Sequence, residues 1–153
     1  MKIIILGANQ VGCALAETLS NEKNDITIVD EDSERLQELN DHIDARVVAG
    51  APSHPSTLLQ AGADDAEMLI AVTDSDETNM VAWHVALTLY KVHRRICRIR
   101  AGSYTKSEKL FRVEGMPDIE IISPEEIVSD YITRLIDLPG SLQVLDFADG
   151  RVQ

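Results

Sequence analysis

A glycine-rich turn near the start of the chain has the residue types and spacing of a phosphate-binding loop. Gly7-Ala8-Asn9-Gln10-Val11-Gly12 fits the pattern Gly-x-Gly-x-x-Gly, except that Asn9 stands at the second glycine. The first glycine of this pattern permits a tight turn, and the last permits close packing of a helix on a strand. The N–H groups at the start of that helix then bind a diphosphate. The turn predicts a nucleotide site that includes Gly7, Asn9, Gln10, Val11 and Gly12.

Asn9 makes the pattern incomplete. The middle glycine normally lets the backbone approach a phosphate closely. Asparagine tolerates a left-handed backbone better than most residues do, but it carries a side chain where glycine has none. We therefore expect the Asn9 side chain to crowd or reposition the phosphate.

An acidic residue lies at the end of the second apolar run. Asp30 follows Gly7 at the spacing, about 20 residues, at which an acid accepts hydrogen bonds from ribose hydroxyls. Such an acid repels a 2′-phosphate, so we expect NAD to be preferred over NADP. The predicted site also includes the adjacent Glu31. The alternative is a glycine turn followed by a solvated aspartate.

Thr73 and Asp74 follow a later apolar run, at the edge of the sheet where folds of this kind bind ligands. Thr73 is a candidate contact for ribose or phosphate. Alternatively, the two residues only cap the next helix, with Asp74 as the cap and Glu77 three residues further on.

Arg98 and Arg100 alternate along a fifth predicted strand and therefore share one face. Burying two guanidinium groups without partners is costly, so we expect them to meet phosphates or carboxylates of the ligand. Salt bridges within this acidic chain are the alternative.

Motifs for catalysis are absent from the sequence. There is no Cys-x-x-Cys, His-Glu-x-x-His, P-loop or Gly-x-Ser-x-Gly. No tyrosine is followed four residues later by lysine, as short-chain dehydrogenases require. Cys13 and Cys97 are expected to be unreactive core residues, and no metal site is expected. These absences favour a nucleotide sensor that is not an enzyme. The alternatives are part of an NAD-dependent oxidoreductase, or a scaffold whose nucleotide site has decayed.

Length and charge narrow the class of protein. The chain has 153 residues, of which 44% are apolar, and this suits a single domain. No apolar run approaches the roughly 20 residues of a membrane span. The net charge of −12 argues against nucleic acid as a partner and against docking on anionic lipid. The composition favours a cytoplasmic protein with an aliphatic core.

The elements that must position these residues alternate along the chain. Apolar runs predict strands at 3–6, 26–29, 46–49, 68–72, 96–99 and 119–122, and helix-like patterns lie at 10–20, 32–43, 55–61, 76–91, 104–114 and 124–137. This alternation predicts an α/β fold, a Rossmann-type doubly wound parallel sheet of about six strands with helices on both faces. A further strand at 142–147 is expected to lead toward another domain.

The quoted motifs resemble those of the regulatory proteins of Trk potassium-uptake systems. The similarity covers nearly the whole chain and rests on 1–12, 24–30, 34–36, 61–66, 71–73, 76–82, 98–100 and 122–125. Its Asp-Glu-Thr-Asn block at 76–79 is more specific than a glycine pattern. Asn9 departs from the resemblance, because that family usually has glycine there.

The resemblance implies a regulator-of-potassium-conductance (RCK/KTN) nucleotide-binding domain at 1–138. Residues 139–153 would begin a crossover to a C-terminal lobe. Such domains bind NAD(H), and in relatives ATP or ADP. In this family the Asp30 position holds ribose, the 7–12 loop holds phosphates, and Thr73, Arg98 and Arg100 complete the pocket.

The same resemblance implies partners and a location. Proteins of this kind are peripheral on the inner face of the cell membrane. They form a dimer or tetrameric ring beneath a potassium-translocating membrane subunit and regulate potassium transport. By the same analogy, helices near 104–114 and 124–137 are the candidate dimer contacts.

Overall fold

The computed structural model describes residues 1–107, 110 and 120–137. Residues Met1–Ile122 form one compact unit, built on a sheet of six parallel strands in the order β3-β2-β1-β4-β5-β6. The strands are β1 (Lys2–Leu6), β2 (Asp25–Asp30), β3 (Arg46–Ala49), β4 (Met68–Ala71), β5 (Arg94–Arg98) and β6 (Glu120–Ile122). The predicted Rossmann-type parallel sheet is confirmed.

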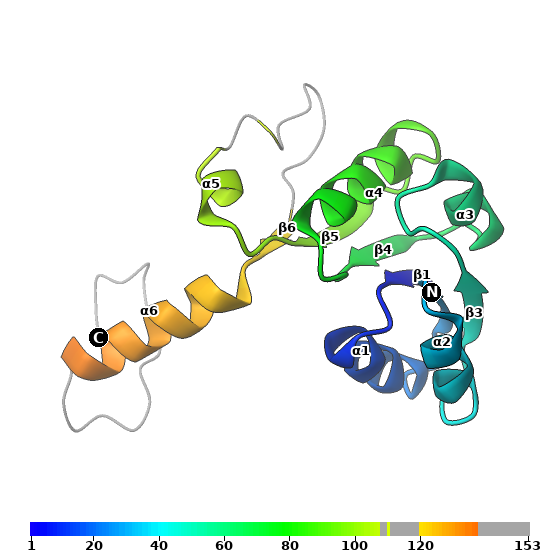
Figure 1. Cartoon of the computed structure of the whole chain (residues 1–153), viewed down its shortest axis with the longest axis horizontal. Helices are drawn as coiled ribbons and strands as arrows, with labels where there is room; N and C mark the ends of the chain where they lie inside the picture. Colours follow the sequence, from blue (N-terminus) through cyan, green and yellow to red (C-terminus); the bar gives the residue numbers. More distant parts are fainter. Residues whose placement is uncertain (108–109, 111–119, 138–153) are drawn as a thin grey trace. The chain divides into compact units, whose positions relative to one another are not determined.

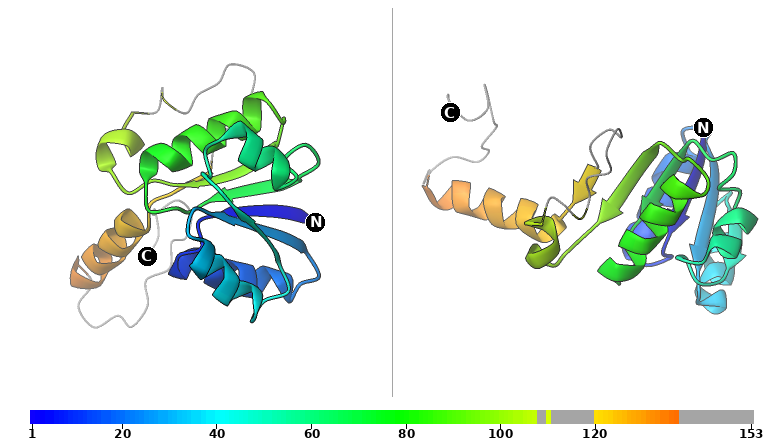
Figure 2. Two further views of the ribbon diagram at one scale, coloured as in Figure 1. Left: turned by 45° about the vertical axis from the view of Figure 1, so that its right-hand side comes forward. Right: turned by 90° about the horizontal axis from the view of Figure 1, so that it is seen from above.

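Helices cover both faces of this sheet (Figures 1 and 2). One face carries α1 (Gln10–Ser20) and α2 (Ser33–Asn40), and the other carries α3 (Pro55–Gln60) and α4 (Asp76–Thr88). The short helix α5 (Gly102–Thr105) follows β5.

Helices pack on both faces of the sheet because its central strands are continuously apolar. Successive side chains of a strand point to opposite faces. In β1, Ile4 and Leu6 join the core beneath α3 and α4, whereas Ile3 and Ile5 join the core beneath α1 and α2. Strand β1 is therefore buried on both faces, as expected of a central parallel strand.

Several helices and strands end at other residues than the sequence predicts. The helix expected at 104–114 is wrong as a continuous element, because α5 ends at Thr105 and a turn follows at Lys106. Helix α4 ends at Thr88, before the expected 91, because the chain turns with Lys91 at a positive φ of 56°. Strand β5 ends at Arg98, so Arg100 lies beyond the strand that was expected to hold it.

Residues Ser123–Gln153 form a second unit, of which α6 (Pro124–Asp137) is described. Helix α6 has the bounds that the sequence predicts. The expected strand at 142–147 and the expected crossover at 139–153 lie outside the described residues, and the domain boundary at 138 stays a prediction. Among the helices that the structure describes, none combines the length and apolar character needed to cross a membrane.

Candidate functional site

The strand order reverses between β1 and β4, and an open pocket of about 320 Å³ lies at the carboxyl ends of these strands and of β2. Ligands of open α/β sheets bind at such a reversal. The lining residues come from loops that are far apart in the sequence: Gly7, Asn9, Asp30, Glu31, Arg35, Pro52, Thr73, Asp74, Ser75 and Thr78.

Two glycines shape the turn between β1 and α1. Gly7 has a φ of +105°, and a Cβ on it would lie 2.9 Å from the Cα of Thr73. A Cβ on Gly12 would lie 1.8 Å from the carbonyl oxygen of Gly7. The loop therefore packs so closely on the end of β4 and on α1 that neither position accepts a side chain without displacement.

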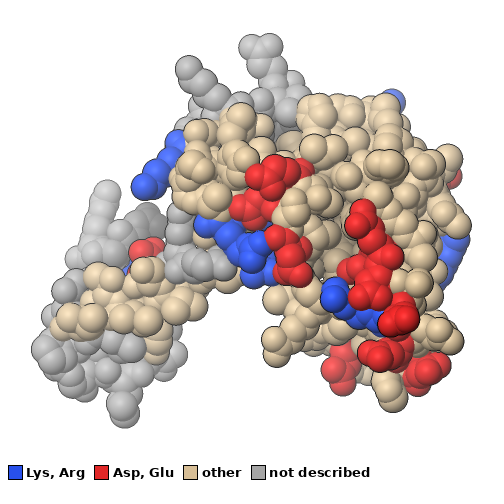
Figure 3. Space-filling model, in the orientation of Figure 1, with Lys and Arg blue, Asp and Glu red and all other residues tan. Residues whose placement is uncertain are grey.

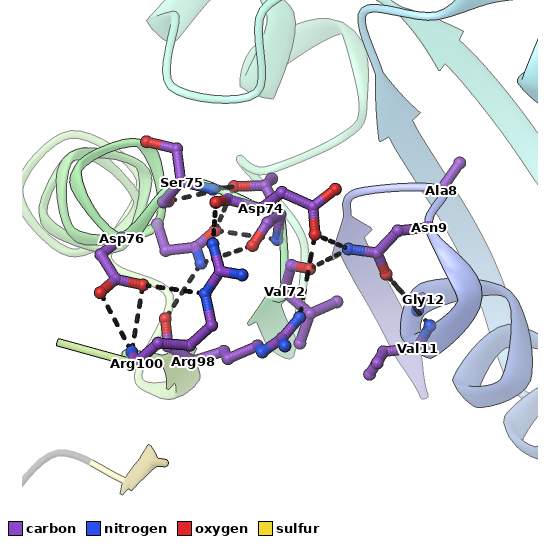
Figure 4. A network of polar contacts seen from close by, with 12 residues as sticks. Ala8, Asn9, Val11, Gly12, Val72, Asp74, Ser75, Asp76, Arg98 and Arg100 are labelled. Atoms are coloured by element: carbon purple, nitrogen blue, oxygen red, sulfur yellow. Dashed lines mark hydrogen bonds and ion pairs between the residues drawn. The ribbon is translucent and has the colours of Figure 1, made fainter. Parts of the chain in front are cut away.

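Asn9 is the N-terminal cap of α1. Its Oδ1 accepts hydrogen bonds from the backbone N–H of Val11 at 3.1 Å and of Gly12 at 3.0 Å. Its Nδ2 donates to the carbonyl oxygen of Val72 at 2.7 Å and to Oδ1 of Asp74 at 3.1 Å (Figure 4). The side chain thus joins the loop after β1 to the segment after β4.

Asp30 ties the same loop to the start of α2. The backbone N–H of Ala8 donates to Oδ2 of Asp30 at 2.6 Å, and that of Asp32 donates to Oδ1 at 2.9 Å. Each carboxylate oxygen has a second lone pair, so Asp30 retains acceptor capacity on the pocket side.

Arg35 is a pocket residue that the sequence analysis did not select. Its guanidinium lies 3.8 Å from Oδ2 of Asp30 and 3.7 Å from Oδ2 of Asp32. The sequence carried a signal for it, since Arg35 lies in the first turn of the helix that follows the acidic end of β2. Arg35 gives the pocket a cation beside its acidic residues.

Asn79 is a second residue whose role the sequence did not indicate: it positions the segment after β4. It is fully buried in α4, and its Oδ1 accepts from the Thr73 hydroxyl at 2.6 Å and from the Thr73 backbone N–H at 3.0 Å. Its Nδ2 donates to the carbonyl oxygens of Thr73 and Arg98 at 3.1 and 3.0 Å. Asn79 therefore holds the ends of β4 and β5 together.

The expectation that Asp74 caps α4 is wrong by one residue. Ser75 is the cap, because its hydroxyl accepts from the backbone N–H of Thr78 at 3.1 Å. Asp74 instead accepts from Asn9, and its Oδ1 lies 4.0 Å from Nη1 of Arg98.

Internal acidic groups contact both candidate arginines. Arg100 Nη2 donates to the backbone carbonyl of Asp74, and its Nε lies 3.8 Å from Oδ1 of Asp76. Asp76 also accepts from the backbone N–H of Arg100 and of Ala101, and so fixes the loop after β5 against α4. The internal salt bridges considered as the alternative are therefore present, and a phosphate role for Arg98 and Arg100 stays a prediction.

The predicted site residues divide into two groups. Gly7, Asn9, Asp30, Glu31, Thr73 and Asp74 line the pocket, whereas Gln10, Val11, Gly12, Arg98 and Arg100 do not. Gly12 is buried and Val11 is exposed, and the backbone N–H of each donates to the side chain of Asn9. On the face drawn in Figure 3, acidic side chains gather in clusters with basic side chains beside them.

The two cysteines, Cys13 and Cys97, both have raised pKa values and therefore lack the thiolate of an activated nucleophile. Burial raises the pKa of the Cys97 thiol to about 12, and the Asp76 carboxylate adds to that shift. Burial likewise raises the pKa of the Cys13 thiol. Within the described part of the chain, no group of three or more His, Cys, Asp or Glu residues is arranged to hold a metal ion.

Comparison with known sequences identifies relatives along the whole chain. Residues 3–124 match the TrkA-N domain family. The chain is 56% identical over 153 residues to the Trk system potassium uptake protein TrkA of Halomonas elongata, and 55% identical to that of Vibrio alginolyticus. These matches cover 100% and 99% of this chain but only 34% and 33% of the relatives. The chain therefore spans about a third of their length.

Solved structures share the fold. The GsuK RCK domain is 25% identical with a TM-score of 0.71, over 92% of this chain and 29% of that one. The GsuK channel bound to NAD is 19% identical with a TM-score of 0.64, over 78% and 21%. The Kef C-terminal domain of Shewanella denitrificans, solved in an AMP-bound form, is 21% identical with a TM-score of 0.67, over 92% and 84%.

Proposed function

This chain belongs to the TrkA-N domain family, and we propose that it is the nucleotide-sensing domain of a regulatory protein of a Trk-type potassium uptake system. The relatives that carry the Trk name extend well beyond this chain, so the activity of the whole protein is part of the proposal. The bound nucleotide is NAD or NADH, with ADP and ATP as further candidates.

One observation carries the proposal. The tight glycine turn, the carboxylate of Asp30 and the segment Thr73–Ser75 all border one open pocket at the reversal of strand order. A dinucleotide site needs these three parts: a helix start for phosphates, an acid for ribose, and a second strand end that closes the crevice.

Each part has a role in holding the nucleotide. The 7–12 loop receives the diphosphate, and Asp30 accepts hydrogen bonds from the ribose hydroxyls with Glu31 beside it. Thr73 and Asp74 border the opposite wall. Arg98 and Arg100 both contact Asp74. In this proposal they supply positive charge to the phosphates once their internal acidic partners rearrange.

Regulation proceeds by a shift of population. A nucleotide that binds one arrangement of the domains more tightly than another favours that arrangement, and only to the extent of the difference in affinity. The potassium-translocating membrane subunit of the Trk system responds to this change. In this proposal the protein is cytoplasmic and peripheral on the inner face of the membrane.

Helix α6 supports the assembly of several copies. It carries exposed apolar side chains at helical spacing, which are Ile127, Val128, Tyr131, Ile132 and Ile136. An apolar stripe of this kind is typical of a helix that packs against another element. We assign it the contact within a dimer or tetrameric ring.

Calorimetric titration of NAD, NADH, ADP and ATP into the protein tests the proposal, with Asp30→Ala as the site variant. We expect micromolar binding of at least one nucleotide and a loss of about tenfold or more in Asp30→Ala. Absence of binding by all four nucleotides contradicts the proposal. Transfer of hydride from bound NADH to a substrate supports the oxidoreductase alternative instead.

A further inference from the structure

Asn9 occupies the hydrogen-bonding groups on which a phosphate site of this kind depends. The first N–H groups of a helix have no partner within the helix. In α1, the side-chain oxygen of Asn9 already accepts from the N–H groups of Val11 and Gly12, at 3.1 and 3.0 Å. A phosphate oxygen that approaches these donors has to displace the Asn9 carboxamide.

The other end of the same carboxamide is anchored. Nδ2 of Asn9 donates to the carbonyl oxygen of Val72 at 2.7 Å and to Oδ1 of Asp74 at 3.1 Å (Figure 4). Asp74 lies 4.0 Å from Nη1 of Arg98, and its backbone carbonyl accepts from Arg100. A carboxylate of the chain itself is therefore placed among the groups that would attract a phosphate.

These contacts make the two walls of the pocket interdependent. Turning the Asn9 side chain away from α1 also breaks its bonds to Val72 and Asp74, since one rigid planar amide makes all of them. Conversely, loss of the Asp74 carboxylate removes one of the contacts that hold Asn9 over the helix start.

We propose that Asn9 and Asp74 form a latch over the phosphate position, which a nucleotide must open before its diphosphate reaches α1. The inference rests on the proposed function, because it describes how the same pocket selects its ligand. The latch weakens binding of the diphosphate part and leaves the nucleoside part unaffected. It also couples phosphate binding to movement of the segment after β4.

Titrations of NAD and of adenosine into four forms of the protein test the latch: the unaltered protein, Asn9→Gly, Asp74→Ala and the double variant. We expect Asn9→Gly to bind NAD about tenfold more tightly, because its helix donors are open. The affinity for adenosine, which has no phosphate, should change by less than about twofold in the same variant. Asp74→Ala tightens NAD binding in the Asn9 background and does so distinctly less in the Asn9→Gly background.

A control variant separates the effect of Asn9 from that of an asparagine-to-glycine change elsewhere in the protein. Asn40→Gly makes the same substitution at an exposed position of α2 and is expected to leave both affinities unchanged. Equal NAD affinity with and without Asn9, or equal tightening of adenosine, overturns the latch while the proposed function stands. An equal effect of Asp74→Ala in both backgrounds also overturns it, because charge repulsion alone then accounts for that effect. If none of the four forms binds NAD, the latch is overturned, and the titrations with NADH, ADP and ATP then decide the proposed function.

Discussion

Asn79 accepts two hydrogen bonds from Thr73, one from the hydroxyl at 2.6 Å and one from the backbone N–H at 3.0 Å. The same buried carboxamide donates to the carbonyl oxygens of Thr73 and Arg98. A helix side chain thus replaces the backbone partners that two strand ends lack. The pocket wall at Thr73 is fixed from within the core.

Asn79→Ala should destabilise the protein by about 2–4 kcal/mol, since it leaves buried donors and acceptors without partners. Urea unfolding followed by circular dichroism measures this change. Asn40→Ala is the matched control, because Asn40 is an exposed helix residue, and it should cost no more than about 0.5 kcal/mol. Equal costs for the two variants would contradict the assigned role of Asn79.

Gly12→Ala should cost at least about 3 kcal/mol, because the added methyl collides with backbone rather than with a flexible side chain. Gly62→Ala provides the comparison. Gly62 also has a positive φ, of +89°, but a Cβ there lies 3.5 Å from its nearest neighbour, the Asp65 carboxylate. Backbone strain alone predicts about 1–2 kcal/mol for Gly62→Ala. Unfolding midpoints that place Gly12→Ala above Gly62→Ala in stability would refute this packing argument.

Asp30→Asn should reduce discrimination between NADH and NADPH about tenfold, because a neutral amide no longer repels a 2′-phosphate. Fluorescence titration with both reduced cofactors gives the ratio of their dissociation constants. Asp32→Asn removes the same charge two residues away, and asparagine caps a helix as well as aspartate does. That control should keep the original ratio. A ratio that changes equally in both variants would point to general charge rather than to ribose recognition.

Cys97 should resist alkylation in the folded protein. Its thiol is buried and has a pKa of about 12, above the value of about 8.5 for an unfolded cysteine. Only the thiolate reacts, so iodoacetamide at pH 8.5 should label Cys97 in guanidinium but not in buffer. A Cys13→Ala background isolates the signal from Cys97.

The raised pKa of Cys97 also makes the free energy of unfolding depend on pH. The folded state holds the Cys97 proton more tightly than the unfolded chain does, so the contribution to stability is complete below about pH 8.5. This stabilisation of the folded state is lost as the pH rises from there toward 12. Rapid labelling of native Cys97 at pH 8.5 would show that the thiol is neither buried nor shifted in this way.

The sheet and the glycine turn were predictable because their signals are local. Apolar β-branched runs such as Ile3–Leu6 mark strands that are buried on both faces, and Gly7 and Gly12 mark a turn that excludes side chains. The polar bridges were not predictable, because they join residues far apart in the chain. Asn9 contacts Asp74 across 65 positions, whereas the neighbouring Ser75 caps α4.

The predicted roles of the arginines show the same limit. Their alternation in the sequence indicated a shared strand face, but β5 ends at Arg98. Arg100 then turns back to the backbone carbonyl of Asp74, just before the cap of α4, and to the carboxylate of Asp76, its first residue. Charge pairing of this kind depends on how two loops approach each other, and spacing along the chain carries no record of it.

In our proposal, a nucleotide binds at the carboxyl edge of the sheet. Backbone amide resonances recorded during titration with NADH test it most directly. We predict shifts concentrated at Gly7–Gly12, Asp30–Asp32 and Thr73–Asp76, which border the pocket or hold its walls. Shifts confined to the opposite edge of the sheet, around Lys2, Gly62 and Asp65, or no shifts at saturating NADH, would contradict the account.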